Sequence, residues 1–179
     1  MNNNKWKEKA QMPPGWAGDG NGKKHILGLM VEDNPGVIER ITGLFFRRGF
    51  NIDTIIVGKT AKPNISHVII SLQASDATIE QLEKQVSKLI EVIKVIDLGE
   101  NSVVREHCLV KINSTEKTRQ DILNFAEMHK AKILEANHTS IIAEVIGAPE
   151  KIDMFIELIR PYGIKEMSRT GVNALPRKG

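Results

Sequence analysis

Apolar residues predict the same order of secondary structure twice along this chain, and this repetition is the strongest constraint on its fold. Each half predicts strand, helix, strand, strand, helix and strand, from runs of alternating apolar residues and from segments with apolar residues at helical spacing. The two halves are not obvious copies in sequence, so the repeat is one of architecture. The predicted strands are 25–31, 50–60, 65–73, 92–98, 106–113, 132–136, 139–146 and 164–169, and the predicted helices begin at 35, 78, 117 and 149.

The residues also predict several local features. Thr78 with Gln81 makes a capping box for the second helix, whose buried stripe includes Ile90. Alternation places Cys108, Val110 and Ile112 on one face of their strand. Asn137-His138 is the predicted tight turn between two strands, because asparagine tolerates left-handed geometry, and a polar tail follows residue 169.

This order is that of the split βαββαβ arrangement, so the predicted fold class is α+β, with two ferredoxin-like domains in tandem. Alternation in the third strand directs Val68, Ile70 and Leu72 to one face of the sheet and Ile69 to the other. Two helices cover one face of each sheet, which leaves the second face and the edge strands open. With Ile65 and Ile69 partly exposed there, we expect the sheet to pair with a second copy of the chain.

The predicted domains are a flexible leader at 1–23, a first domain at 24–99 and a second domain at 100–179. The leader is polar and without periodicity, and it lacks the apolar middle of a secretory signal. No stretch approaches the roughly 18 consecutive apolar residues of a membrane span. The single cysteine, Cys108, excludes an internal disulfide. Together these features predict a cytoplasmic protein that does not contact a membrane.

Composition and motifs argue against nucleic-acid binding and against catalysis. The formal net charge is only +3, charges alternate in sign, and the 4% of aromatic residues do not align on a strand as an RNA-binding sheet requires. The histidines show no metal-ligand spacing, and no phosphate-binding loop, dinucleotide fingerprint or nucleophile elbow occurs. We therefore predict no catalytic residue, no metal site and no nucleic-acid partner.

The sequence Glu-Asp-Asn-Pro-Gly-Val-Ile at 32–38 connects the first predicted strand to the first helix. Pro35 suits the first position of a helix, which makes Asn34 the predicted N-cap, and Gly49 is the predicted end. Backbone N–H groups at such a turn can bind a carboxylate or a phosphate. Geometry alone does not decide between such a ligand site and a simple strand-to-helix connection with a favourable N-cap. The side-chain amide of Asn51, after the helix, favours a ligand site because it can both donate and accept hydrogen bonds.

The chain resembles the small, regulatory subunits of acetohydroxyacid synthase (acetolactate synthase), a family that begins with an amino-acid-sensing ACT domain. Three segments carry the resemblance in the family's order and spacing, and they are EDNPGVIERITGLFFRRGFNIDTIIVG, VREHCLVKI and SRTGVNAL. The resemblance covers about residues 25–177, almost everything but the leader.

The resemblance implies a subunit that is not an enzyme by itself and holds no cofactor. Thiamine diphosphate, Mg and FAD are expected on the catalytic large subunit. The small subunit is expected to activate that partner and to make it sensitive to valine or another branched-chain amino acid, in valine, leucine and isoleucine biosynthesis. Two alternatives stay open: a free-standing ACT-type amino-acid-binding regulator, although no DNA-binding helix-turn-helix is evident, and an RNA-binding protein of similar topology.

The resemblance also implies an effector site between the ACT domains of two copies, and therefore a homodimer through these domains. Gly36 matches the glycine of the family's ligand turn, and Asn51 matches its ligand-binding asparagine. Asp33 stands where many members have asparagine, and an ionised Asp33 would attract the ammonium group of an amino acid but repel its carboxylate. The predicted effector-binding residues are Asp33, Gly36, Val37, Ile38, Asn51 and Ile52, and Val31 also flanks the turn.

Overall fold

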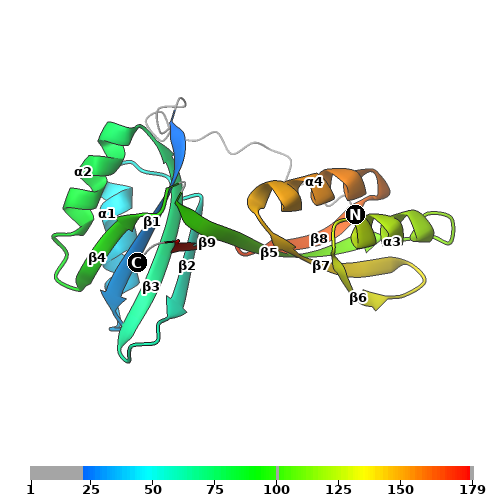
Figure 1. The fold of residues 1–179 in the computed structure, drawn as a ribbon, viewed down its shortest axis with the longest axis horizontal. Coiled ribbons are helices and arrows are strands. Elements are labelled where there is room, and N and C mark those ends of the chain that lie inside the picture. Colours follow the sequence, from blue (N-terminus) through cyan, green and yellow to red (C-terminus); the bar gives the residue numbers. More distant parts are fainter. Residues whose placement is uncertain (1–21, 100, 178–179) are drawn as a thin grey trace, which may run out of the picture.

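The computed structural model describes residues 22–99 and 101–177, which form two antiparallel sheets, each with two helices packed on one face (Figure 1). Both halves have the predicted element order, so the α+β fold of two tandem ferredoxin-like units is confirmed. Residues 1–21 of the predicted leader lie outside the described residues, and Lys23 is already in the first strand. The elements are β1 (Lys23–Glu32), α1 (Val37–Arg47), β2 (Thr54–Lys59), β3 (Ile65–Ala74), α2 (Asp76–Val86), β4 (Val92–Asp97), β5 (Ser102–Asn113), α3 (Arg119–Met128), β6 (Lys132–Ala136), β7 (Ser140–Gly147), α4 (Pro149–Ile159), the short 3-10 helix η1 (Arg160–Tyr162), β8 (Ile164–Arg169) and β9 (Asn173–Pro176).

The first sheet has the strand order β2-β3-β1-β4, and β2 and β4 are its edges. Alternation in β3 buries Val68, Ile70 and Leu72 completely in the core under the two helices, as predicted. α1 contributes Ile41 and Phe45 to the same core from its apolar stripe. One face of this sheet is therefore held by packing against α1 and α2.

α2 begins and ends earlier than the sequence predicted. Ser75, not Thr78, is the N-cap, because its side chain accepts a hydrogen bond from the backbone N–H of Thr78 at 3.3 Å while its own backbone stays extended. The predicted capping box of Thr78 with Gln81 is therefore wrong. The helix stops at Val86, so Ile90 lies in the following turn and is 89% exposed instead of buried.

The second sheet has the strand order β6-β7-β5-β8, with β9 paired to the first part of β5. Cys108, Val110 and Ile112 point from β5 into the core under α3 and α4, as predicted. Burial raises the pKa of the Cys108 thiol, so the side chain is a protonated, apolar part of this core. Pro149 is the first residue of α4, which confirms the predicted helix start.

The β6–β7 hairpin turns at Asn137, as predicted, but the hydrogen bonds that close the turn differ from the predicted geometry. Its side-chain Oδ1 accepts hydrogen bonds from the backbone N–H groups of Thr139 and Ser140 at 3.0 and 2.9 Å. The turn is thus closed by an asparagine side chain in place of the left-handed backbone that the sequence suggested.

The C-terminal segment contradicts two predictions. It was expected to be a polar tail, but β9 pairs with residues 102–105 of β5 and forms a two-stranded ribbon. This β5–β9 ribbon lies against the second face of the first sheet, where Val172 and Ala174 bury Ile69 to 2% exposure together with Leu98. Ile69 is therefore not partly exposed, because the chain covers it with its own C-terminal strand. Ile65 does remain partly exposed. None of the helices in the described part of the chain is long and apolar enough to cross a membrane.

We expect Ile69→Ala to lower the free energy of unfolding by about 2–5 kcal/mol, the usual cost of truncating a fully buried isoleucine. The matched control is Val57→Ala on the edge strand β2, where the side chain is 49% exposed and the expected loss is about 1 kcal/mol or less. Chemical denaturation of the two variants measures the difference. Equal losses would mean that the ribbon leaves the second face open to water.

Candidate functional site

The turn between β1 and α1 has the geometry of a type II β-turn over residues 34–37. The backbone N–H of Val37 donates to the carbonyl of Asn34 at 3.4 Å, and Gly36 has φ +83° and ψ −6°. α1 therefore begins at Val37 with Gly36 as its N-cap, so the predictions of Asn34 as N-cap and Pro35 as first helical residue are wrong. The physical reason is the Pro-Gly pair, since a glycine that accepts positive φ lets proline take the second position of this turn.

Hydrogen bonds fix the residues on the β1 side of the turn. The backbone N–H of Asp33 donates to the carbonyl of Asn64 at 2.9 Å, and its carboxylate accepts the hydroxyl of Ser66 at 3.1 Å. The side-chain amide of Asn34 donates to the carboxylate of Glu32 at 2.8 Å. The turn is consequently anchored to the start of β3 while its residues remain exposed.

An arginine that sequence reasoning missed lies next to Gly36. Arg40 Nη1 pairs with Oε1 of the buried Glu91 at 2.7 Å. A methyl group added at Gly36 would lie 3.9 Å from Arg40 Nη2. The first amides of α1 and this guanidinium together favour a negatively charged group above Gly36. Arg40 could have been suspected because it follows Gly36 by one helical turn, but nothing in the sequence links it to Glu91.

Asn51 and Ile52 follow the C-terminal end of α1. That end is a Schellman motif, in which Gly49 has φ +75° and donates to Phe46 while Phe50 donates to Phe45, both at 3.0 Å. The prediction that the second strand starts at residue 50 is wrong, because residues 50–53 cross from the helix to the sheet and β2 starts at Thr54. Asn51 is exposed in this crossing segment.

The structure does not bring the Gly36 turn and Asn51 together within one chain. The turn is bonded to Asn64 at the start of β3, whereas Asp53, beside Asn51, donates to Ser71 near the other end of that strand. These two points are about 23 Å apart at the usual strand rise. One amino acid cannot contact both places in a single protomer.

The apolar residues predicted around the turn divide into two groups. Val31 and Val37 are buried in the core of the first sheet, so only the backbone of Val37 can meet a ligand. Ile38 and Ile52 are partly buried against the same core and keep some exposed surface.

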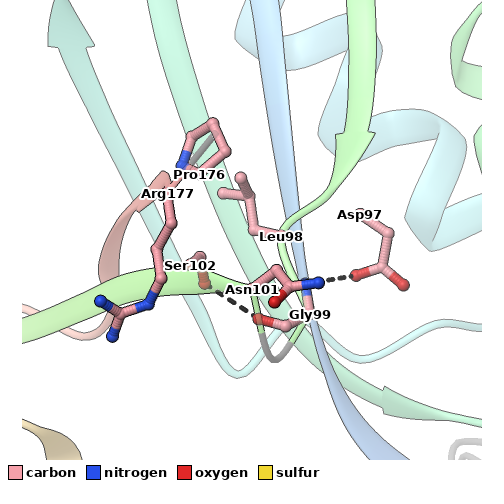
Figure 2. A pocket seen from close by; sticks show the side chains of 7 residues that line it. All are labelled: Asp97, Leu98, Gly99, Asn101, Ser102, Pro176 and Arg177. Atoms are coloured by element: carbon pink, nitrogen blue, oxygen red, sulfur yellow. Dashed lines mark hydrogen bonds between the residues drawn. The ribbon is translucent and has the colours of Figure 1, made fainter. Parts of the chain in front are cut away.

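A hollow of about 480 Å³ lies where the connection after β4 meets the end of β9, a place to which no sequence motif pointed (Figure 2). Its polar groups bond mainly to one another, since the backbone N–H of Gly99 donates to Asp97 at 3.1 Å and the hydroxyl of Ser102 donates to the Gly99 carbonyl at 3.0 Å. These groups shape the connection between the two halves, and they carry no catalytic arrangement.

Arg169, the last residue of β8, fixes the end of this strand to β5 and α4. Arg169 pairs with the buried Glu106 and, through Nη1, with Asp153 of α4 at 2.6 Å. Burial disfavours the charge of Arg169, but its hydrogen bonds to Asp153 and Glu106 outweigh this effect and raise the pKa of the guanidinium.

The part of the chain that the structure describes contains no group of three His, Cys, Asp or Glu side chains that could hold a metal ion.

Comparisons with known proteins place both halves in one family. A family profile described as "Small subunit of acetolactate synthase" matches residues 105–178, and one described as "AHAS small subunit-like ACT domain" matches residues 27–94. An Archaeoglobus fulgidus protein named "Probable acetolactate synthase small subunit" is 42% identical over 154 residues, which are 86% of this chain and 97% of that protein. The chain belongs to the acetolactate synthase small subunit family.

Two further members of the family agree. The acetolactate synthase small subunit of Bacillus subtilis is 40% identical over 156 residues, covering 86% of this chain and 91% of that protein. The crystal structure of the acetolactate synthase small subunit from Thermotoga maritima superposes with a TM-score of 0.81 at 38% identity, over 88% of this chain and 99% of that one. The family that the three sequence segments indicated is therefore confirmed.

In this small subunit we expect Gly36→Ala to lower the free energy of unfolding by about 1–2 kcal/mol, because an alanine at φ +83° is strained even where space is available. Gly58→Ala in β2 is the matched control, since a methyl group there meets no other atom of the described residues within 4 Å, its own chain neighbours aside, and Gly58 has no positive φ. Its effect should stay within about 0.5 kcal/mol. Thermal and chemical denaturation check both values, and equal stability of the two variants would contradict the left-handed turn.

Proposed function

We propose that this chain is the regulatory subunit of an acetolactate synthase, which binds the catalytic large subunit, raises its activity and confers feedback inhibition by valine or another branched-chain amino acid. The observation that carries the proposal is the left-handed Gly36 turn in an ACT-type domain of this family. The chain itself is non-catalytic in this proposal, and the thiamine diphosphate, Mg and FAD belong to the large subunit in the cytoplasm.

The effector carboxylate is proposed to lie above Gly36, against the first amides of α1 and near Arg40 Nη2. Negative charge is favoured at a helix N-terminus, and the guanidinium adds an opposite charge on the same side of the turn. The effector ammonium group is proposed to lie toward Asp33, whose Oδ1 already accepts from Ser66 while Oδ2 is available. Asp33 thus suits the ammonium group of an amino acid and disfavours ligands that carry a carboxylate alone.

The site requires two copies of the chain, because the Gly36 turn and Asn51 lie at opposite ends of α1. β2 is an edge strand, and two β2 strands paired antiparallel about a twofold axis would continue the sheet across the dimer. Both α1 helices would then lie on the same face in opposite directions, with each Gly36 end facing the Asn51 end of the other copy. Ile38 and Ile52, which keep exposed surface, are proposed to contact the aliphatic side chain.

The C-terminal half, residues 100–179, is proposed to form much of the contact with the large subunit, which rests on the family resemblance. Exposed apolar side chains in this half support it, since Leu134 of β6 is 47% exposed and Ile146 of β7 is 52% exposed. Contact with a protein partner would remove this apolar surface from water, which is favourable.

The first test is co-purification of the full chain with an acetolactate synthase large subunit, followed by activity assays with and without valine, leucine or isoleucine. We expect a stable complex with higher activity than the large subunit alone, and loss of that activity with one of the three amino acids. A complex that forms without any amino acid response would overturn the sensing role. Binding of valine without any complex would instead favour a free-standing regulator.

The second test is Gly36→Asp, which we expect to keep the fold and to abolish effector binding measured by calorimetry. Aspartate tolerates positive φ better than most residues, and its carboxylate would lie beside Arg40 in the place proposed for the effector carboxylate. Gly36→Asn is the matched control, because it has nearly the same size without the charge and should weaken binding less. Unchanged affinity in the aspartate variant would mean that the effector binds elsewhere.

A further inference from the structure

The segment Thr170–Gly171 brings the C-terminal half into contact with the start of β2. Thr170 is fixed to β5, because its backbone N–H donates to the carbonyl of His107 at 3.0 Å and its hydroxyl accepts from the N–H of His107 at 3.2 Å. Gly171 then has φ +82°, and a methyl group there would lie 2.4 Å from Cβ of Thr54. The Gly171–Thr54 contact is therefore too close for any other residue at position 171 unless one of the two segments moves.

Thr54 is bonded to the same β3 residue as the segment that contains Asn51. Its hydroxyl is 2.7 Å from the hydroxyl of Ser71, and the preceding Asp53 donates its N–H to the carbonyl of Ser71 at 2.9 Å. Asn51 lies two residues before Asp53 in the chain. We therefore expect a ligand that holds Asn51 to restrain Thr54 through this short segment.

The two sides of the contact differ in their freedom to move. Arg169 fixes the chain before Gly171 to Glu106 and Asp153. The chain after Gly171 packs against the first sheet through Val172 and Ala174, and from Asn173 onward it pairs with residues 102–105 of β5 in the ribbon. A hollow of about 360 Å³ adjoins the contact and is lined by residues of both halves. A shift of Thr54 can therefore be followed by the β5–β9 ribbon without breaking the Arg169 ion pairs.

We propose that the Gly171–Thr54 contact transmits effector binding at Asn51 to the C-terminal half by moving the β5–β9 ribbon. This inference rests on the proposed function, and it adds to it the route by which the sensing domain changes the half expected to contact the large subunit. The Arg169-Thr170-Gly171 sequence then has a defined part in regulation: arginine and threonine anchor the segment, and glycine allows the close approach.

The test measures hydrogen exchange of the backbone amides of 172–175 in the full chain, with and without valine, leucine or isoleucine. In the wild-type chain we expect the effector to change these exchange rates at least about threefold. Gly171→Ala should remove this change, while calorimetry still finds effector affinity within about threefold of wild type. In the complex with the large subunit, the same variant should raise the inhibition constant about 5–150-fold, the usual range of coupling between sites.

Two further variants separate coupling from misfolding. Gly163→Ala is the matched control, because Gly163 also has a positive φ of +92°. A methyl group at Gly163 would lie 3.6 Å from Cβ of Asn113, which is an ordinary contact. The Gly163→Ala variant should therefore keep the exchange response to the effector. Thr54→Gly opens the contact without adding atoms and should also lose the response, whereas Thr54→Gly with Gly171→Ala should regain it, because the methyl group then occupies the space of the lost side chain.

The outcomes distinguish the two proposals. A wild-type chain that binds none of the three amino acids would overturn the proposed function and this inference with it. Effector binding with unchanged exchange at 172–175, or a full response in Gly171→Ala or Thr54→Gly, would overturn this inference alone.

Discussion

β5 takes part in both halves of the molecule, and the rest of the structure depends on this shared strand. Its first residues pair with β9 over the first sheet, and from Glu106 onward it pairs with β7 and β8 in the second sheet. The alternation of its side chains directs Val104 to the cluster around Ile69 and Cys108 to the core under α3 and α4. Burial of apolar surface, at about 25 cal/mol per Å², therefore anchors one end of β5 on the first sheet and the other end in the core of the second sheet.

The candidate site depends on backbone geometry more than on side chains. Positive φ at Gly36 sets the turn, and α1 supplies the amides. Arg40 adds a charge opposite to that of a carboxylate beside Gly36. The length of α1 separates this turn from Asn51. The same helix that forms the proposed amino acid site therefore also makes one protomer insufficient to enclose the proposed ligand.

The sequence predicted the elements whose signal is long or periodic, and it missed those decided by a single neighbour. Val68, Ile70 and Leu72 alternate over most of β3, so their burial was predictable. Pro149 opened a helix as expected, but Pro35 did not, because the following Gly36 permits a type II turn. The same local competition moved the N-cap of α2 from Thr78 to Ser75.

Contacts between segments that are distant in the sequence produce no periodic pattern from which they could be predicted. β9 has only four residues, too few for alternation to show, and it forms because β5 extends beyond the second sheet. Arg40 and Glu91 are far apart in sequence, and their ion pair follows from the packing of α1 beside the turn before β4.

The separation in sequence between the first sheet and β9 has a consequence for folding during synthesis on the ribosome. All strands of the first sheet have been translated long before Val172 and Ala174 leave the exit tunnel, so the nascent first domain displays an uncovered apolar surface at Ile69 and Leu98. Only when β9 has emerged can it close that surface. A nascent chain that stops before Val172 would therefore leave an apolar surface in water and be prone to aggregate.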